Sequence, residues 1–198
     1  QTDARLSACR KVCRGSKLFC VFQQRLTDSV NFSRPWPDYV SGFGDEDNFW
    51  IGLELLSLIT SLSNSTLRAE LFDWSDAMFS AEYLGFVVKN ASTQYTMDYA
   101  GFLSANSNVT GDSLSLCRGE KFSTMDRDND NFGGSCSLIY HGAAGWWFRG
   151  CSNVNPNGWM TSGQVDNFPK AVHWYSVHGN KNSLKAVRLL VQLPTEGP

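Results

Sequence analysis

The segment that decides the fold spans residues 121–159 and reads KFSTMDRDNDNFGGSCSLIYHGAAGWWFRGCSNVNPNGW. Its first part places a run of Asp and Asn side chains and two glycines in front of Cys136. This run has two interpretations. Asp, Asn and Gly are the residues that turns prefer, whereas hard cations are held by carboxylate and backbone oxygens. The loop is therefore either a polar turn or a calcium site.

The calcium interpretation does not follow the EF-hand pattern. Counted from Asp126, the sixth residue is Asn131 instead of Gly, and the twelfth is Ser137 instead of a bidentate Glu. Asp128 and Asp130 remain, and their spacing of two residues lets both carboxylates turn toward one centre in a curled loop. Backbone carbonyls farther along, freed by the two glycines, would complete the shell. The residue types alone leave both interpretations open.

The whole chain has 198 residues and a formal net charge of -2. This length favours one domain with a sizeable core. Lys and Arg are scattered, so the sequence lacks the basic footprint of a nucleic-acid-binding protein. The longest apolar candidate, residues 49–62, is interrupted by Glu54 and by several Ser and Thr residues. We therefore expect no nucleic-acid partner and no membrane span.

The cysteines and the glycosylation motifs indicate an extracellular protein. The six cysteines are an even number, which suits disulfides in an oxidising compartment, although their spacing leaves the connectivity open. A zinc site is the alternative, but the chain has no CxxC pair and only three histidines. We expect a secreted glycoprotein with N-glycosylation sequons at Asn31, Asn64, Asn90 and Asn108.

Apolar spacing predicts a sheet and two helices. One helix is expected over 49–62, with Asp47 or Asn48 as its cap, and a short one within 34–44. Strands are expected over 19–22, 67–74, 79–88, 94–99 and 184–193. From 129 to 170 the regular spacing gives way to Gly, Asn, Pro, Ser and Trp. Such a long irregular segment inside a compact domain indicates function, held in place by a disulfide and a bound ion.

Segment 121–159 closely resembles the part of the fibrinogen-like domain that holds its calcium loop, second disulfide and ligand pocket. The resemblance continues in VFQQRLTDSVNFSRPWPDYVSGFGDEDNFWIGLELLSLIT (21–60), GDSLS (111–115) and AVHWYSVHGNKNSLKAVRLLV (171–191). It covers about Cys20 to Gln192. This fibrinogen C-terminal, ficolin/tachylectin-type family implies an α+β fold with a central antiparallel sheet, short helices and a long irregular calcium- and ligand-binding subdomain. Residues 1–198 would then be a single domain with a shortened N-terminal subdomain.

The resemblance also implies a calcium site. Carried over residue by residue, Asp128 and Asp130 provide side-chain oxygens, and Phe132 and Gly134 provide backbone carbonyls. With this resemblance the calcium interpretation is preferred over the polar turn. The Ca²⁺ ion is then expected to fix the wall of the neighbouring ligand pocket.

The same resemblance predicts a disulfide and a ligand pocket. Cys136 is expected to pair with Cys151, and the family's cis peptide before the second cysteine falls at the Gly150–Cys151 bond. The expected ligand-binding residues are Tyr140, Trp147, Cys151, Ser152 and Phe168.

The chain also departs from the family pattern. Ser152 stands where acetyl-binding members usually have His, and Phe168 stands where they have Tyr, so two hydrogen-bond donors are changed. GAAGWW (142–147) is two residues longer than the usual GAWW. The first disulfide region is compressed into ACRKVCRGSKLFC (8–20), which leaves the pairing of four cysteines without a template: Cys9, Cys13, Cys20 and Cys117.

Two non-enzymatic functions follow. The first is a secreted, calcium-stabilised lectin that recognises glycans or glycoproteins, with acetylated or microbial sugars as ligands and a role in innate immunity. The alternative is a recognition or adhesion module that binds a protein receptor through the same face, and a homo-oligomer fits both functions. The sequence has no GxSxG elbow and no HExxH zinc pattern. We therefore expect no enzymatic activity.

Overall fold

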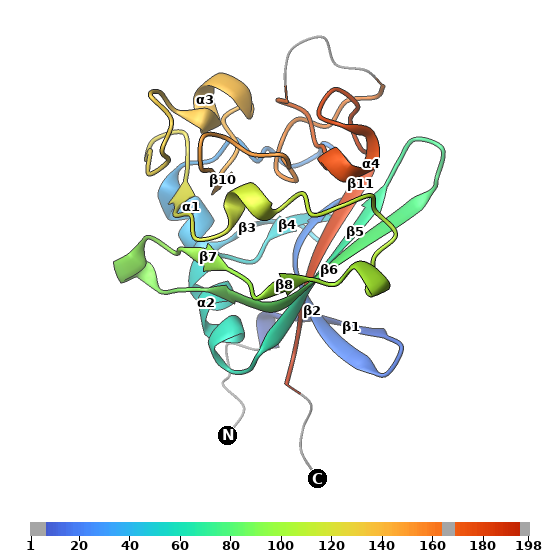
Figure 1. The fold of residues 1–198 in the computed structure, drawn as a ribbon. Helices are drawn as coiled ribbons and strands as arrows, with labels where there is room; N and C mark the ends of the chain where they lie inside the picture. The colour runs from blue at the N-terminus through green and yellow to red at the C-terminus, as the bar shows by residue number, and fades with distance from the viewer. Residues whose placement is uncertain (1–6, 164–168, 195–198) are drawn as a thin grey trace.

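The computed structural model describes residues 7–163 and 169–194 (Figure 1). The strands of this part are β1 Arg10–Arg14, β2 Lys17–Arg25, β3 Phe43–Gly44, β4 Asn48–Trp50, β5 Ser65–Phe72, β6 Met78–Val88, β7 Met97–Asp98, β8 Gly101–Phe102, β9 Phe122–Ser123, β10 Trp146–Trp147 and β11 Ala186–Gln192. The helices are α1 Trp36–Ser41, α2 Leu53–Ser61, α3 Cys136–Tyr140 and α4 Tyr175–His178, with 3-10 turns η2 Ala91–Thr93, η3 Ser104–Asn106 and η4 Ser115–Cys117.

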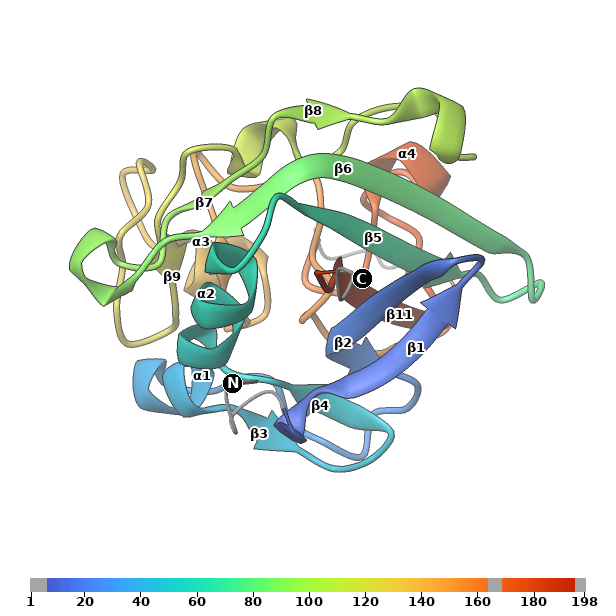
Figure 2. The same ribbon diagram turned by 90° about the horizontal axis from the view of Figure 1, so that it is seen from below.

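One antiparallel sheet dominates the fold, in the order β3-β4-β2-β11-β5-β6-β7. β1 adds to β2 and β8 adds to β6, while β9 and β10 form a separate two-stranded pair. The sheet is curled, and α2 lies on its inner side (Figure 2). The last strand, β11, lies between β2 and β5, so the two ends of the described chain meet in the middle of the sheet. The α+β fold is therefore as predicted.

The predicted helix over 49–62 is shorter than expected. Asn48–Trp50 is strand β4, and α2 begins only at Leu53 because Gly52 has a φ of 101°, which breaks the helical path. Asn48 does not cap this helix. Its side-chain oxygen accepts hydrogen bonds from the backbone N–H groups of Leu26 and Thr27, so it fixes the end of β2 instead.

The strand predicted over 94–99 is also shorter than expected. Only Met97–Asp98 pairs with β6, because Gln94 and Tyr95 have positive φ values of 57° and 54° that turn the chain. Strands β2 and β6 contain the strands predicted over 19–22 and 79–88, whereas β5 ends at Phe72 and β11 spans only Ala186–Gln192, so the predictions 67–74 and 184–193 are confirmed in part. β1 was not predicted, since its sequence RKVCR has little apolar alternation.

A cluster of aromatic rings joins the sheet to the irregular subdomain. Tyr39 lies on α1 and Trp50 on β4, while Phe122 and Trp147 lie on β9 and β10. All four side chains are buried. Phe122 lies 5.2 Å from the Tyr39 ring and 5.0 Å from the Trp147 ring, measured between centroids. These contacts have the separations that aromatic pairs prefer. They hold residues 121–159 firmly on the sheet, although that segment has little regular structure.

Candidate functional site

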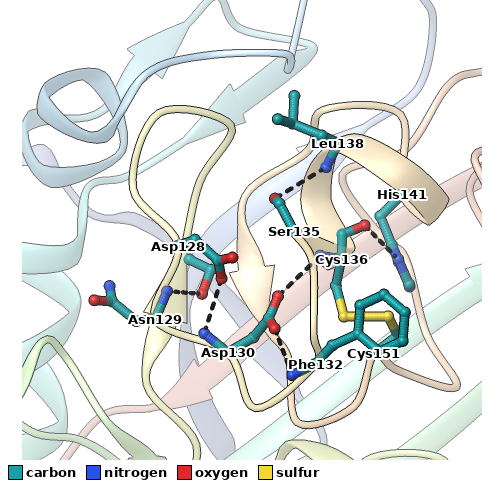
Figure 3. Close-up of a disulfide and its surroundings, with 10 residues drawn as sticks. Asp128, Asn129, Asp130, Phe132, Ser135, Cys136, Leu138, His141 and Cys151 are labelled. Carbon is teal, nitrogen blue, oxygen red and sulfur yellow. Dashed lines mark hydrogen bonds between the residues drawn. A yellow bond between two sulfur atoms is a disulfide. The ribbon is translucent and has the colours of Figure 1, made fainter.

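The predicted calcium loop lies between β9 and α3 and curls around Asp130. The Asp130 carboxylate accepts hydrogen bonds from the backbone N–H of Phe132 at 2.8 Å and from that of Cys136 at 2.9 Å (Figure 3). Asp128 accepts one from the N–H of Asp130 at 3.1 Å. Asn129 ties the loop to β9, because its side-chain amide donates to the Phe122 carbonyl at 2.7 Å. The loop is therefore shaped by its own acidic and amide side chains.

The electrostatics of this loop suit a cation. Burial raises the pKa of the Asp130 carboxyl, and the neighbouring negative charge of Asp128 raises it further. A divalent cation between the two carboxylates would offset both effects. Within the described residues no three His, Cys, Asp or Glu side chains come together as metal ligands. Backbone carbonyls would have to complete the shell, and those of Phe132 and Gly134 in the same loop are the ones that the resemblance implies. The residues present therefore fit a Ca²⁺ ion.

The disulfide that follows the loop links Cys136 to Cys151, with 5.2 Å between their α-carbons. Cys136 opens helix α3, where Ser135 caps the helix by accepting a hydrogen bond from the N–H of Leu138. The described residues contain no cis peptide bond, so the Gly150–Cys151 bond is trans, contrary to what the resemblance implied. Instead, Cys151 turns the chain with a φ of 81°, a conformation that is costly for a residue other than glycine.

The other cysteines are now assigned. Cys9 pairs with Cys20 across the first hairpin. Cys13 is an exposed free thiol on β1, and Cys117 is a buried free thiol. The Cys117 sulfur lies 3.2 Å from the Ser152 hydroxyl oxygen, and burial raises the pKa of this thiol to about 12. The Cys117 thiol is therefore neutral at physiological pH.

A cavity of about 540 Å³ opens between the calcium loop and the disulfide. Three of the predicted ligand-binding residues line it, namely Tyr140, Cys151 and Ser152. Its other lining residues are Leu116, Phe132, His141, Gly150, Asn153, Pro169 and Asn180. The ring of Phe132 lies 5.5 Å from that of Tyr140 and meets it edge to face. The predicted calcium loop therefore contributes Phe132 to the wall of the cavity.

Of the other two predicted ligand residues, only Trp147 can be placed relative to this cavity, and it does not line it. Trp147 is fully buried, and its indole N–H donates to the Tyr95 carbonyl at 2.7 Å. The structure thus places Trp147 in the aromatic core, because β10 turns its side chain toward β9 and the sheet. Phe168 lies outside the described residues.

His141 is a cavity residue that the sequence did not single out. Its ring is buried, and its Nδ1–H donates to the Cys136 carbonyl at 3.3 Å, since a carbonyl can only accept. Burial lowers the pKa of His141 to about 3, and the nearby His173 lowers it further. His141 is therefore neutral and presents an uncharged wall. No sequence motif distinguishes it, because its position depends on how α3 ends.

Exposed apolar side chains lie on the predicted calcium loop and on α3, which also carries Tyr140 of the cavity. Leu138 and Ile139 of α3 are about half exposed, at 52% and 48%, and Phe132 is 39% exposed. Ile139 lies over the calcium loop, since a β-carbon built on Gly134 would come within 2.9 Å of it. We call Phe132, Leu138 and Ile139 the apolar rim. Exposed apolar groups gathered beside a cavity are typical of a binding surface.

Comparison with known proteins identifies relatives over nearly the whole chain. Residues 11–194 match the family described as fibrinogen beta and gamma chains, C-terminal globular domain. Microfibril-associated glycoprotein 4 of Mus musculus is 36% identical over 190 residues, covering 93% of this chain and 72% of that protein. The fibrinogen-like globe domain of human ANGPTL2 superposes with a TM-score of 0.83 at 29% identity, covering 94% of this chain and 92% of that one.

A further solved structure carries a ligand. Lamprey fibrin D-dimer, complexed with the peptide Gly-His-Arg-Pro-amide, superposes with a TM-score of 0.84 at 26% identity. The match covers 96% of this chain and 67% of the lamprey chain.

Among the described residues, no helix is both long and apolar enough to cross a membrane.

Proposed function

Because this chain belongs to the fibrinogen C-terminal globular domain family, whose members are non-enzymatic recognition modules, we propose that it is a secreted, calcium-binding lectin. Its ligands are glycans, with acetylated or microbial sugars as the best candidates. They enter the cavity beside the calcium loop. Two intrachain disulfides support an oxidising, extracellular location.

One observation carries this proposal. The predicted calcium loop and the Cys136–Cys151 disulfide, which hold segment 121–159 in place, also contribute residues to the wall of the cavity. Phe132 comes from the calcium loop and Cys151 from the disulfide, and both line the same 540 Å³ space. A preformed concavity of this size suits a small ligand. Ion binding and ligand binding should therefore be coupled, because the ion fixes the loop that carries Phe132.

The chemistry of the cavity suits an uncharged polar ligand. Tyr140 and Ser152 bring hydroxyl groups, Asn153 brings an amide, and His141 is neutral. Phe132 and Tyr140 provide aromatic surface for a methyl group or a sugar ring. With Ser152 in place of the family's His, fewer strong donors face the ligand. Affinity for a single acetylated sugar should then be weak, and useful binding would need several domains acting together.

Calcium has a structural role in this proposal. Asp128 and Asp130 would hold the ion with their carboxylates, and Phe132 and Gly134 would hold it with their carbonyls. The ion supplies positive charge that offsets the repulsion between the two carboxylates. It takes no part in any chemical step.

The apolar rim favours a second candidate function. Phe132, Leu138 and Ile139 expose apolar surface that a small sugar would not cover, whereas a protein partner would. The lamprey fibrin relative was solved with a peptide ligand. A protein-recognition or adhesion module that uses the same face is therefore the alternative.

A glycan array probed with and without a calcium chelator tests the proposal most directly. We expect binding to acetylated glycans in Ca²⁺ and its loss in chelator, with recovery when Ca²⁺ is restored. Binding to no glycan, together with capture of a protein ligand that depends on Leu138 and Ile139, would favour the alternative function.

Three further proposals accompany this function. The chain is a single fibrinogen-like domain with a shortened N-terminal subdomain, as the compact Cys9–Cys20 hairpin suggests. It carries N-glycans, because all four sequon asparagines are exposed. Microbial glycans are the preferred ligands in an immune role.

A further inference from the structure

A second cavity lies away from the calcium loop and contains a glycosylation sequon. It measures about 320 Å³, and its lining includes Arg25, Asp28, Asn31, Ser33, Trp159 and Met160. We call it the Asn31 groove. Asn31 and Ser33 are the first and third residues of the sequon Asn31-Phe32-Ser33. The same groove therefore holds a candidate attachment point and a large aromatic side chain.

Trp159 forms a fixed, half-exposed platform in this groove. Its ring is 50% exposed, although its indole N–H donates to the Gly142 carbonyl at 3.1 Å. The ring packs directly on Gly142, where a β-carbon would lie only 2.7 Å from the indole nitrogen. About half of the Trp159 side chain is thus exposed, with the Lys170 ammonium 5.4 Å from its ring centroid, while the rest is anchored. A chemical group that packs on the exposed part of the Trp159 ring would remove its apolar surface from water.

The sequon is tied to the same anchor. The Ser33 hydroxyl donates to the Gly142 carbonyl at 2.8 Å, so the sequon and the Trp159 indole share one acceptor atom. The Asn31 side-chain oxygen accepts a hydrogen bond from the Ser33 N–H at 2.9 Å, which fixes the amide beside the groove. Asn31 is exposed, whereas Phe32 is 2% exposed and holds the sequon backbone in the protein. A glycan would therefore leave the chain from a fixed point next to Trp159.

We propose that the Asn31 groove is occupied by the protein's own N-linked glycan, attached to Asn31, with its first N-acetylhexosamine units packed on Trp159. The C–H face of a pyranose ring is apolar and matches the flat face of an indole. The exposed Asp28 carboxylate at the groove can accept hydrogen bonds from the hydroxyl and acetamido N–H groups at the sugar's edges. The groove is thus an internal glycan site and not a second surface for external ligands.

The other three sequons lie in different surroundings. Asn90 caps the turn Ala91–Thr93. Asn108 uses both side-chain atoms on β6, accepting from the Ser80 N–H at 2.6 Å and donating to the Met78 carbonyl at 3.2 Å. Asn64 follows α2 in an exposed turn. Asn64 is therefore a matched control that offers glycan attachment without the Asn31 groove.

The test uses the chain secreted from eukaryotic cells. Glycopeptide mass spectrometry should find Asn31 occupied. Hydroxyl-radical footprinting should show that Trp159 is oxidised severalfold faster in Asn31→Gln than in the wild type, and at the wild-type rate in Asn64→Gln. Trp74, which is 48% exposed, serves as the internal reference and should react equally in all three proteins.

A second measurement distinguishes a glycan that packs on Trp159 from one that is only attached to Asn31. Peptide N-glycosidase should release the Asn31 glycan from native protein more slowly than the Asn64 glycan, and the difference should vanish after denaturation. Trp159→Ala keeps the sequon but should lose this resistance. The proposal is overturned if Asn31 carries no glycan. It is equally overturned if Trp159 in the wild type is oxidised as fast as in Asn31→Gln.

Discussion

At the scale of single residues, Tyr140 and His141 show how neighbours in sequence take different roles. Both line the cavity, but Tyr140 is partly exposed and contacts the Phe132 ring, while His141 is buried with its Nδ1–H bound to a carbonyl. The difference arises because α3 ends at Tyr140, so the chain turns inward at the next residue. The spacing of apolar and polar residues along the sequence predicts neither of these roles.

We predict that Tyr140→Ala abolishes glycan binding and leaves the melting temperature in Ca²⁺ nearly unchanged. The substitution removes both the hydroxyl and the aromatic surface from the cavity wall, whereas Tyr140 is not part of the buried core. Binding is measured on the array and stability by calorimetry. Leu138→Ala, on the same helix but outside the cavity lining, is the control and should keep glycan binding. A Tyr140→Ala protein that unfolds would show instead that Tyr140 is a structural residue.

His173 carries a prediction on pH. Its buried ring donates through Nδ1–H to the Ala171 carbonyl, and burial lowers its pKa to about 4. The unfolded chain, with an ordinary His pKa near 6.5, then binds more protons than the folded chain between these values. Stability is therefore complete above about pH 6.5 and declines as the pH falls toward 4.

We expect His173→Gln to weaken this decline by about 2 kcal/mol between pH 7 and pH 4.5, because one buried imidazole no longer resists protonation. Urea unfolding at the two pH values gives the two free energies of unfolding. His141 stays in place and should retain a decline of its own, since its pKa is lowered as well. An identical pH dependence in wild type and variant would contradict the prediction.

At the scale of elements, the calcium loop depends on the structures at its two ends. β9 pairs with β10 before the loop, and the disulfide of α3 closes it, so its ends are fixed before any ion binds. The loop itself has no regular structure and is shaped by hydrogen bonds to Asp130. An ion at Asp128 and Asp130 would therefore stabilise a loop whose ends and turns are already held by the protein.

We predict that Asp128→Asn lowers calcium affinity and removes most of the calcium-dependent rise in melting temperature. A ligand at about 100 times its dissociation constant stabilises the folded state by about 2.7 kcal/mol, which corresponds to several degrees for a domain of this size. Calorimetry in Ca²⁺ and in chelator measures the rise. Asp126→Asn removes the same charge from the same loop but should keep the effect, because Asp126 is directed to Trp36 and Thr124. Equal melting temperatures with and without Ca²⁺ in the wild type would indicate an ordinary polar turn.

At the scale of the whole molecule, the binding subdomain and the sheet are held together by an aromatic core. Trp147 is central to it, in contact with Trp50, Phe122 and Trp146 at centroid distances of 6.2, 5.0 and 4.9 Å. A tryptophan expected in a ligand pocket is thus a residue that joins the two halves of the fold. Its removal should affect the cavity only by loosening the segment that forms it.

We predict that Trp147→Ala lowers the free energy of unfolding by about 3–5 kcal/mol, the usual cost of truncating a large buried aromatic side chain. Chemical denaturation measures this loss. Trp74→Ala, at an exposed turn after β5, should cost about 0.5 kcal/mol or less. Trp147→Phe keeps a six-membered aromatic ring, so its loss of unfolding free energy should lie between the losses of Trp147→Ala and Trp74→Ala. If Trp147→Ala were as stable as Trp74→Ala but failed to bind glycans, Trp147 would belong to the ligand site after all.

The resemblance of local motifs to a known family already implied the family, the α+β fold and the Cys136–Cys151 pair, and alternating apolar residues predicted the central strands. The start of α2 is set locally by the positive φ of Gly52, which the apolar spacing did not reveal, and the trans bond before Cys151 was apparent only in the structure. The burial of Trp147 depends on contacts between segments far apart in the chain, such as the one between its indole and the Tyr95 carbonyl, so no local pattern could predict it. The Asn31 groove arises in the same way, since Ser33 and Trp159 meet at Gly142 only in the folded protein.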